Sequence, residues 1–172
     1  MQIKAGRKRQ HTIRVLLFII PNTVIDIYNV KKRVNHMAKL ELKAEVGGLE
    51  RVTAFIDEQL EAADCPVKTQ MQIELAVEEI FVNIANYAYP PGKGVVSISA
   101  EIAGGTAVIT FEDKGVPYDP LEKTDPDINL SAEQREIGGL GIFMVKKSMD
   151  DVRYEYRDGM NILTLVKEFM PK

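Results

Sequence analysis

The pattern of hydrophobic and polar residues divides most of the chain into short strands and amphipathic helices. Apolar and charged residues alternate over residues 40–46, which predicts a strand with one buried face. After Gly47-Gly48, apolar residues recur at helical spacing as far as Cys65-Pro66, which predicts an amphipathic helix. Further along, we expect a hairpin of strands 95–102 and 107–111 across Gly104-Gly105, a helix over 139–150, and strands near 152–156 and 162–169.

Helices and strands in this order predict an α+β fold. We expect a two-layer sandwich in which helices cover one face of a mixed, mostly antiparallel sheet. The polar segment 117–136 is predicted to be a mobile lid, and a plain surface loop is the alternative. We assign residues 37–172 to this domain and residues 1–36 to an N-terminal extension of uncertain role.

The extension differs from the rest because basic residues precede an apolar run, Ile13–Ile20, and then Pro21. The run is too short to span a bilayer, so no transmembrane segment is predicted, and no small-residue cleavage site follows it. Three interpretations stay open: an extra strand packed on the domain, a peripheral contact with a membrane or partner, or a leader translated upstream of the natural start. Met37 stands directly before the first predicted strand, which favours the third.

The segment Ile73–Tyr89 is apolar on nearly every side and predicts a buried helix. It carries Glu79, Asn83 and Asn86 at spacings of four and three, so these polar groups share one face. A carboxylate and two amides on a buried surface are costly without partners, and a metal ion with a phosphate chain would supply them. A helix whose polar edge faces water is the alternative, and this segment alone favours it.

Two later motifs favour a ligand site over a polar helix edge that faces water. Asp113 and Gly115 follow a predicted strand, which places a carboxylate beside a backbone that can approach a ligand closely. An ordinary turn would have the same composition. Glycines around Leu140 open the predicted helix over 139–150, and backbone N–H groups at a helix N-terminus attract phosphate. A flexible loop before a helix cap is the alternative there.

In this order the three motifs resemble the boxes of the gyrase, chaperone and histidine-kinase superfamily of ATP-binding domains. The matching residues, box by box, are Glu79 and Asn83, then Asp113 and Gly115, then Gly139, Leu140 and Gly141. Thr164 resembles the threonine of the terminal strand, which lies near adenine in the family. The resemblance covers roughly residues 40–169. Within the superfamily, the chain is most similar to the anti-sigma factor serine/threonine kinases, which are single short domains.

The resemblance implies ATP and Mg²⁺ as cofactors. Asn83 would supply an oxygen ligand to magnesium, and Asn86 would belong to the same nucleotide site. Glu79 would be the catalytic residue that orients or deprotonates the attacking hydroxyl group.

The other two boxes would bind the nucleotide. Asp113 would accept a hydrogen bond from the adenine amino group, with Gly115 beside it. Backbone amides of the Gly139–Gly141 turn would approach the phosphates. Pro117 stands where the family often has a second glycine, which changes the loop after the second box but keeps Asp113.

The resemblance also implies a function, that of an ATP-binding anti-sigma regulatory factor. Such a serine/threonine kinase phosphorylates an anti-anti-sigma antagonist and binds a sigma factor. The alternative is a nucleotide-dependent interaction module that transfers no phosphate. Retention of Glu79 favours the enzyme. The sequence names neither the sigma factor nor the antagonist, and it leaves a homodimer open.

Net charge and the numbers of cysteine and histidine residues limit the partners, compartment and chemistry that we expect. A formal net charge of −3 argues against direct binding of nucleic acid through overall charge. Cys65 is the single cysteine, which excludes an intramolecular disulfide and is typical of a reducing compartment, so we expect a cytoplasmic protein. His11 and His36 both precede the predicted domain, so neither a zinc site nor a catalytic histidine is expected.

Overall fold

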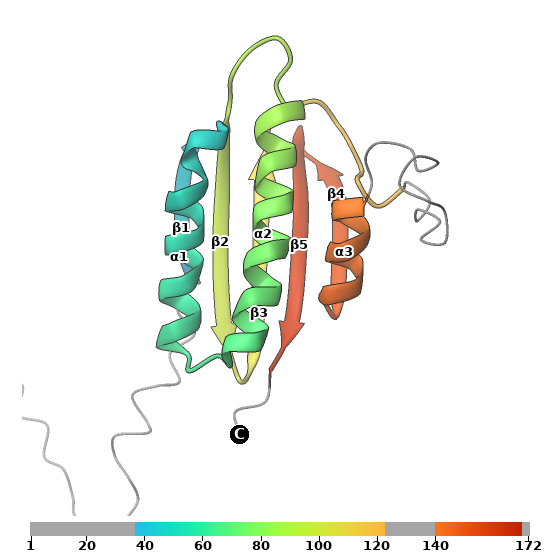
Figure 1. Ribbon diagram of the computed structural model, residues 1–172. Helices are drawn as coiled ribbons and strands as arrows, with labels where there is room; N and C mark the ends of the chain where they lie inside the picture. Colours follow the sequence, from blue (N-terminus) through green and yellow to red (C-terminus); the bar gives the residue numbers. More distant parts are fainter. Residues whose placement is uncertain (1–36, 123–139, 170–172) are drawn as a thin grey trace, which may run out of the picture. The chain divides into compact units, whose positions relative to one another are not determined.

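The structure is a computed structural model that describes residues 37–122 and 140–169. Within these ranges, one five-stranded sheet has the order β1-β2-β3-β5-β4, and every neighbouring pair is antiparallel. Three α-helices cover one face of the sheet (Figure 1). This arrangement confirms the predicted α+β sandwich. The elements are β1 (Met37–Lys43), the short 3-10 helix η2 (Val46–Gly48), α1 (Leu49–Ala62), α2 (Val67–Tyr87), β2 (Val95–Ala103), β3 (Thr106–Asp113), α3 (Leu140–Ser148), β4 (Asp151–Arg157) and β5 (Met160–Glu168).

The core lies between the sheet and the helices because β3, and β2 as far as Glu101, alternate between buried and more exposed residues. The buried positions of β2 and β3 belong to the same cluster as the apolar faces of α1 and α2. The completely covered side chains of this cluster include Phe81, Phe111, Ile56, Leu60, Ile73, Ile98 and Ile109. Asp113 continues the alternation of β3 at its last position and is therefore buried as well.

Helix α2 is longer than its apolar pattern predicts. It begins at Val67, directly after Pro66, whose carbonyl accepts hydrogen bonds from the next turn. The added residues Val67 and Met71 are exposed, at 71% and 64% of their surface, and Leu75 within the predicted segment is 53% exposed. The prediction that the helix is buried on nearly every side is therefore wrong for Leu75, which lies on the same helix face as Met71.

Cys65 lies at the junction of α1 and α2, where its thiol is free and buried, and burial raises the thiol pKa. None of the helices in the described ranges is both long and apolar enough to span a membrane.

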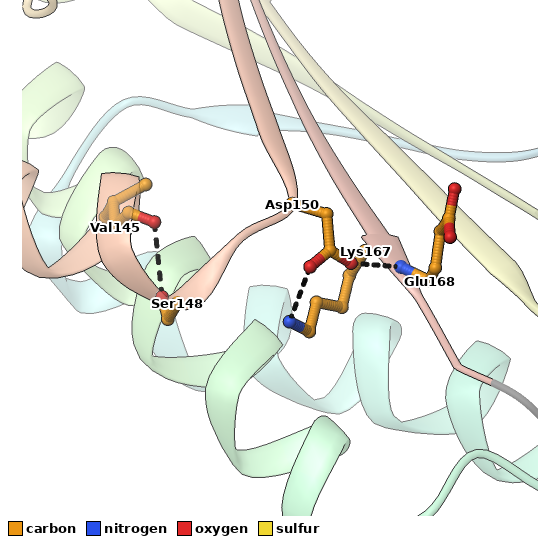
Figure 2. Close-up of polar contacts among 5 residues, drawn as sticks. All are labelled: Val145, Ser148, Asp150, Lys167 and Glu168. Atoms are coloured by element: carbon orange, nitrogen blue, oxygen red, sulfur yellow. Dashed lines mark hydrogen bonds and ion pairs between the residues drawn. The ribbon is translucent and has the colours of Figure 1, made fainter.

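A carboxylate joins the turn between α3 and β4 to the C-terminal end of β5 (Figure 2). Asp150 accepts a hydrogen bond from the backbone N–H of Glu168 at 2.6 Å and another from Lys167 Nζ at 3.1 Å. The backbone N–H of Glu168, followed by Lys167, holds the pKa of Asp150 below its ordinary value despite some desolvation. The ionised carboxylate therefore stabilises the start of β4 against β5.

Replacing Asp150 with asparagine should lower the free energy of unfolding at pH 7 by about 0.5–1 kcal/mol, the range for a partly exposed charged pair. Because the folded pKa is lowered, this stabilisation is present above the ordinary carboxyl pKa of about 3.9 and is lost as the pH falls through the folded value. Urea unfolding at pH 7 and near pH 3 should therefore show a smaller difference between the two proteins at the lower pH. Glu58→Gln, at an exposed position of α1, is the matched control. A difference that does not change with pH would contradict this role of the Asp150 charge.

Candidate functional site

The second motif is held by strand pairing. Asp113 ends β3, and its partner across the ladder is Asn161 of β5. Asp113 Oδ1 accepts hydrogen bonds from the backbone N–H of Gly115 at 2.7 Å and from Asn161 Nδ2 at 3.0 Å. Asp113 and Asn161 are both buried, at 5% and 7% exposure. Within the described part of the chain Asp113 Oδ2 has no hydrogen-bond partner, so the carboxylate is fixed with one acceptor oxygen free.

The first motif forms a pair one helical turn apart on α2. Asn83 Nδ2 donates a hydrogen bond to Glu79 Oε1 at 2.9 Å. A carboxylate only accepts hydrogen bonds, so this contact orients the amide and leaves Asn83 Oδ1 free of partners among the described residues. Asn86 lies further along the helix and is exposed.

A free amide oxygen suits a hard cation that binds oxygen, and phosphate and water would complete its shell. The described residues contain no group of three or more His, Cys, Asp or Glu side chains that could hold a metal on their own. Asn83 Oδ1 therefore offers one oxygen ligand to such a cation, and the other ligands would have to come from bound molecules.

The third motif touches the first. A side chain at Gly141, the second residue of α3, would overlap the Glu79 carboxyl group. The groove between α2 and α3 has a volume of about 190 Å³ and mostly apolar walls, and Glu79 and Gly141 are among its lining residues. A groove of this size is smaller than a typical ligand pocket. Glycine at this position is therefore what allows α3 to lie directly against the Glu79 carboxylate.

The loop after Asp113 is fastened to the end of α2. Val116 N–H donates to the Ala88 carbonyl at 2.8 Å, and a side chain at Gly115 would overlap the Ala88 backbone. Lys114 N–H donates to the Tyr89 hydroxyl at 2.9 Å. Burial is the main cause that raises the pKa of Tyr89, so this hydroxyl stays neutral. These contacts bring the C-terminal end of α2 next to the second motif.

The structure places two of the remaining predicted site residues, Thr164 and Leu140, and does not describe the third, Gly139. Thr164 was expected near the adenine, but it pairs with Thr110, and their hydroxyl groups lie 3.3 Å apart. Both threonines point to the sheet face away from Asp113, because residues an odd number apart on a strand face opposite sides. The structure therefore does not bring Thr164 to Asp113.

Leu140 is the first residue of α3 and is 48% exposed. Gly139 lies outside the described residues.

Sequence reasoning missed Asn161 and Tyr154. The Tyr154 hydroxyl donates a hydrogen bond to Asn161 Oδ1 at 2.7 Å. A signal for Asn161 was present, because it shares the strand face of Leu163 and Leu165 and is the polar member of an apolar stripe. The spacing of Tyr154 in the sequence carries no signal of this contact.

Comparison with known proteins agrees with this geometry. Residues 42–167 match the histidine kinase-like ATPase domain family. The chain is 26% identical over 106 residues to the serine/threonine-protein kinase BtrW of Bordetella bronchiseptica, which covers 61% of this chain and 75% of that protein. It is 30% identical over 95 residues to the serine-protein kinase RsbW of Bacillus cereus, which covers 53% of this chain and 59% of that protein.

One solved structure, of the RsbU and RsbW domains of Rv1364c from Mycobacterium tuberculosis, aligns with a TM-score of 0.56 and 18% identity. The alignment covers 78% of this chain and 32% of that one. At this identity the likeness shows a shared fold.

Replacing Gly141 with alanine should move the Glu79 carboxylate without unfolding the protein. The new methyl group would overlap the carboxyl, which can rotate away at the end of a flexible side chain and release Asn83. Alanine is favoured over glycine in a helix by about 0.5–1 kcal/mol, so the net change in stability should stay within about 1 kcal/mol. The NMR signals of the Asn83 side-chain amide should shift.

Gly47→Ala is the matched control, because no atom lies within 4 Å of a methyl group added there. The Asn83 amide signals should be the same in this variant as in the wild type. Equal spectra for Gly141→Ala and Gly47→Ala would show that α3 does not rest against Glu79 in solution.

Proposed function

The chain belongs to the histidine kinase-like ATPase domain family, and from that premise we propose that it is an anti-sigma regulatory factor with ATP- and magnesium-dependent protein serine/threonine kinase activity. It would phosphorylate an anti-anti-sigma antagonist and bind a sigma factor. The observation that supports this best is the buried Asp113 carboxylate with one oxygen left for a donor. Asp113 Oδ1 is held by two donors, so Oδ2 can accept a hydrogen bond from the amino group of adenine.

The other motifs supply the remaining contacts of this proposal. Asn83 Oδ1 would bind magnesium, which neutralises phosphate charge when bound. The N-terminus of α3, with Leu140 and Gly141, would face the phosphates, and Gly139 stays part of this prediction.

Glu79 is the proposed general base. Its Oε1 accepts the hydrogen bond from Asn83, which leaves Oε2 to take the proton of an attacking serine hydroxyl. As the serine oxygen bonds to the transferred phosphorus, the bond between that phosphorus and the oxygen of ADP breaks. Because Asn83 is on the same helix, base and magnesium ligand keep a fixed spacing.

A nucleotide-dependent interaction module without phosphotransfer is the second candidate. The contact of Glu79 with Asn83 and Gly141 favours it, since these contacts give the carboxylate a place in helix packing that needs no catalysis. The proposed partners, a cytoplasmic location and the ATP-binding domain at residues 37–172 are common to both candidates. The single free thiol of Cys65 supports the location.

Asp113→Asn should lower ATP affinity about 10- to 100-fold and leave the fold intact, as expected for loss of a charged hydrogen-bond partner. The N–H donors of Gly115 and Asn161 would select the amide oxygen at the position of Oδ1. The amide NH₂ would then replace Oδ2 and oppose the adenine amino group, donor against donor.

Calorimetric titration with ATP and Mg²⁺ measures this effect. Glu112→Gln is the matched control, because Glu112 precedes Asp113 but points to the other face of the sheet. Wild-type affinity in Asp113→Asn would remove the nucleotide assignment of this motif.

Glu79→Gln should keep nucleotide affinity and slow phosphate transfer by about 100- to 10,000-fold, the usual contribution of a general base. The glutamine oxygen can still accept the hydrogen bond from Asn83. Transfer of labelled phosphate to a serine-containing antagonist is the measurement, and Glu78→Gln at the exposed neighbouring position is the control. A normal transfer rate in Glu79→Gln would exclude it as the base, and no transfer by the wild type would favour the interaction module.

A further inference from the structure

We propose that Asn161, oriented by Tyr154, makes Asp113 selective for purines that carry an amino group at position 6. This inference rests on the proposed nucleotide binding and concerns how the base is chosen. Asn161 would act as a positioning residue, through Asp113 and without contact to the nucleotide.

The first step is the orientation of the Asn161 amide. Its Nδ2 lies 3.0 Å from Asp113 Oδ1, and its Oδ1 lies 2.7 Å from the Tyr154 hydroxyl. A reversed amide would place oxygen against oxygen at Asp113, which is repulsive because a carboxylate has no proton to donate. The Tyr154 hydroxyl satisfies the amide oxygen, so the observed orientation pairs both ends of the amide.

The loop after Asp113 supports the same orientation. Backbone N–H of Tyr118 donates to Asn161 Oδ1 at 3.3 Å. The carbonyl oxygens of Gly115 and Val116 lie 3.4 and 3.2 Å from Asn161 Nδ2. Acceptors therefore surround the amide nitrogen and donors face the amide oxygen. This network ties one side chain of β5 to the backbone of residues 115–118.

The second step is the effect on Asp113. Two donors, Gly115 N–H and Asn161 Nδ2, converge on Oδ1 and fix the plane of the carboxylate. Oδ2 is left as a pure acceptor in a set direction. An amino group at position 6 of the purine donates a hydrogen bond to Oδ2. A carbonyl at position 6 places an oxygen against Oδ2, which is repulsive. A purine with only hydrogen at position 6 has no polar donor for Oδ2. Selection by Asp113 would therefore depend on Asn161 holding its other oxygen.

The third step separates this role from ordinary packing. If Asn161 only held residues 115–118 in place, its loss would lower the affinity for every purine nucleotide by the same factor. If Asn161 acts through Asp113, its loss would lower the affinity for ATP and leave unchanged the affinity for an analogue that lacks the amino group. The ratio of the two affinities is thus a readout that general loosening of the loop does not move.

The test uses the full chain and two nucleotides, ATP and purine riboside triphosphate, each titrated with Mg²⁺. The wild type should prefer ATP by at least about tenfold, as expected for a hydrogen bond to a charged group. Asn161→Leu removes all polar contacts at similar volume and should reduce this preference to about twofold or less, with the analogue affinity within about threefold of wild type.

Tyr154→Phe removes only the hydroxyl that orients the amide, and it keeps the test decisive if Asn161→Leu does not fold. Its preference for ATP should fall by about three- to tenfold. Tyr156→Phe, an exposed tyrosine of the same strand, is the control and should leave the preference unchanged.

Equal weakening of both nucleotides in Asn161→Leu and Tyr154→Phe, or an unchanged preference in both, would overturn the inference. A wild type that binds ATP and the analogue equally would also overturn it, since no selectivity would exist to explain. A wild type that binds neither nucleotide would instead overturn the proposed function itself.

Discussion

The antiparallel pairing of β3 with β5 is the constraint on which both the core and the candidate site depend. Its register sets Phe111 opposite Leu163 under the helices and, two residues further, Asp113 opposite Asn161. The same alternation that buries apolar side chains therefore also buries a carboxylate. A shift of one residue would turn Asp113 to the other face and lose both the core contacts and the site.

Much of this could be predicted from the sequence, since each strand and helix has a regular pattern of apolar residues. The α+β sandwich, the hairpin of β2 and β3, and the order of the motifs follow from local periodicity and composition. The start of α2 could not be placed, because the added residues Val67 and Met71 are apolar yet exposed. Periodicity predicts which face of a helix is buried, and it does not predict how far the helix continues past its buried residues.

The site itself was predictable only in part. Glu79 and Asn83 pair as their spacing on one helix requires, and Asp113 lies at a strand end. The pairing of Asn161 with Asp113 depends on the register between β3 and β5, which single-strand patterns do not contain. The face of Thr164 relative to Asp113 is likewise read from the ladder between β3 and β5, and its place near the adenine stays a prediction.

The contact between Gly115 and Ala88 joins backbone to backbone, with the Val116 N–H bonded to the Ala88 carbonyl and no room for a side chain at position 115. The separation between the first and second motifs is therefore set by main-chain atoms, which every substitution at the surrounding positions leaves in place. A side chain at position 115 would push the end of α2 away from the loop after β3, and with it the first motif away from the second. This glycine therefore acts as a spacer that sets how far apart the two motifs lie.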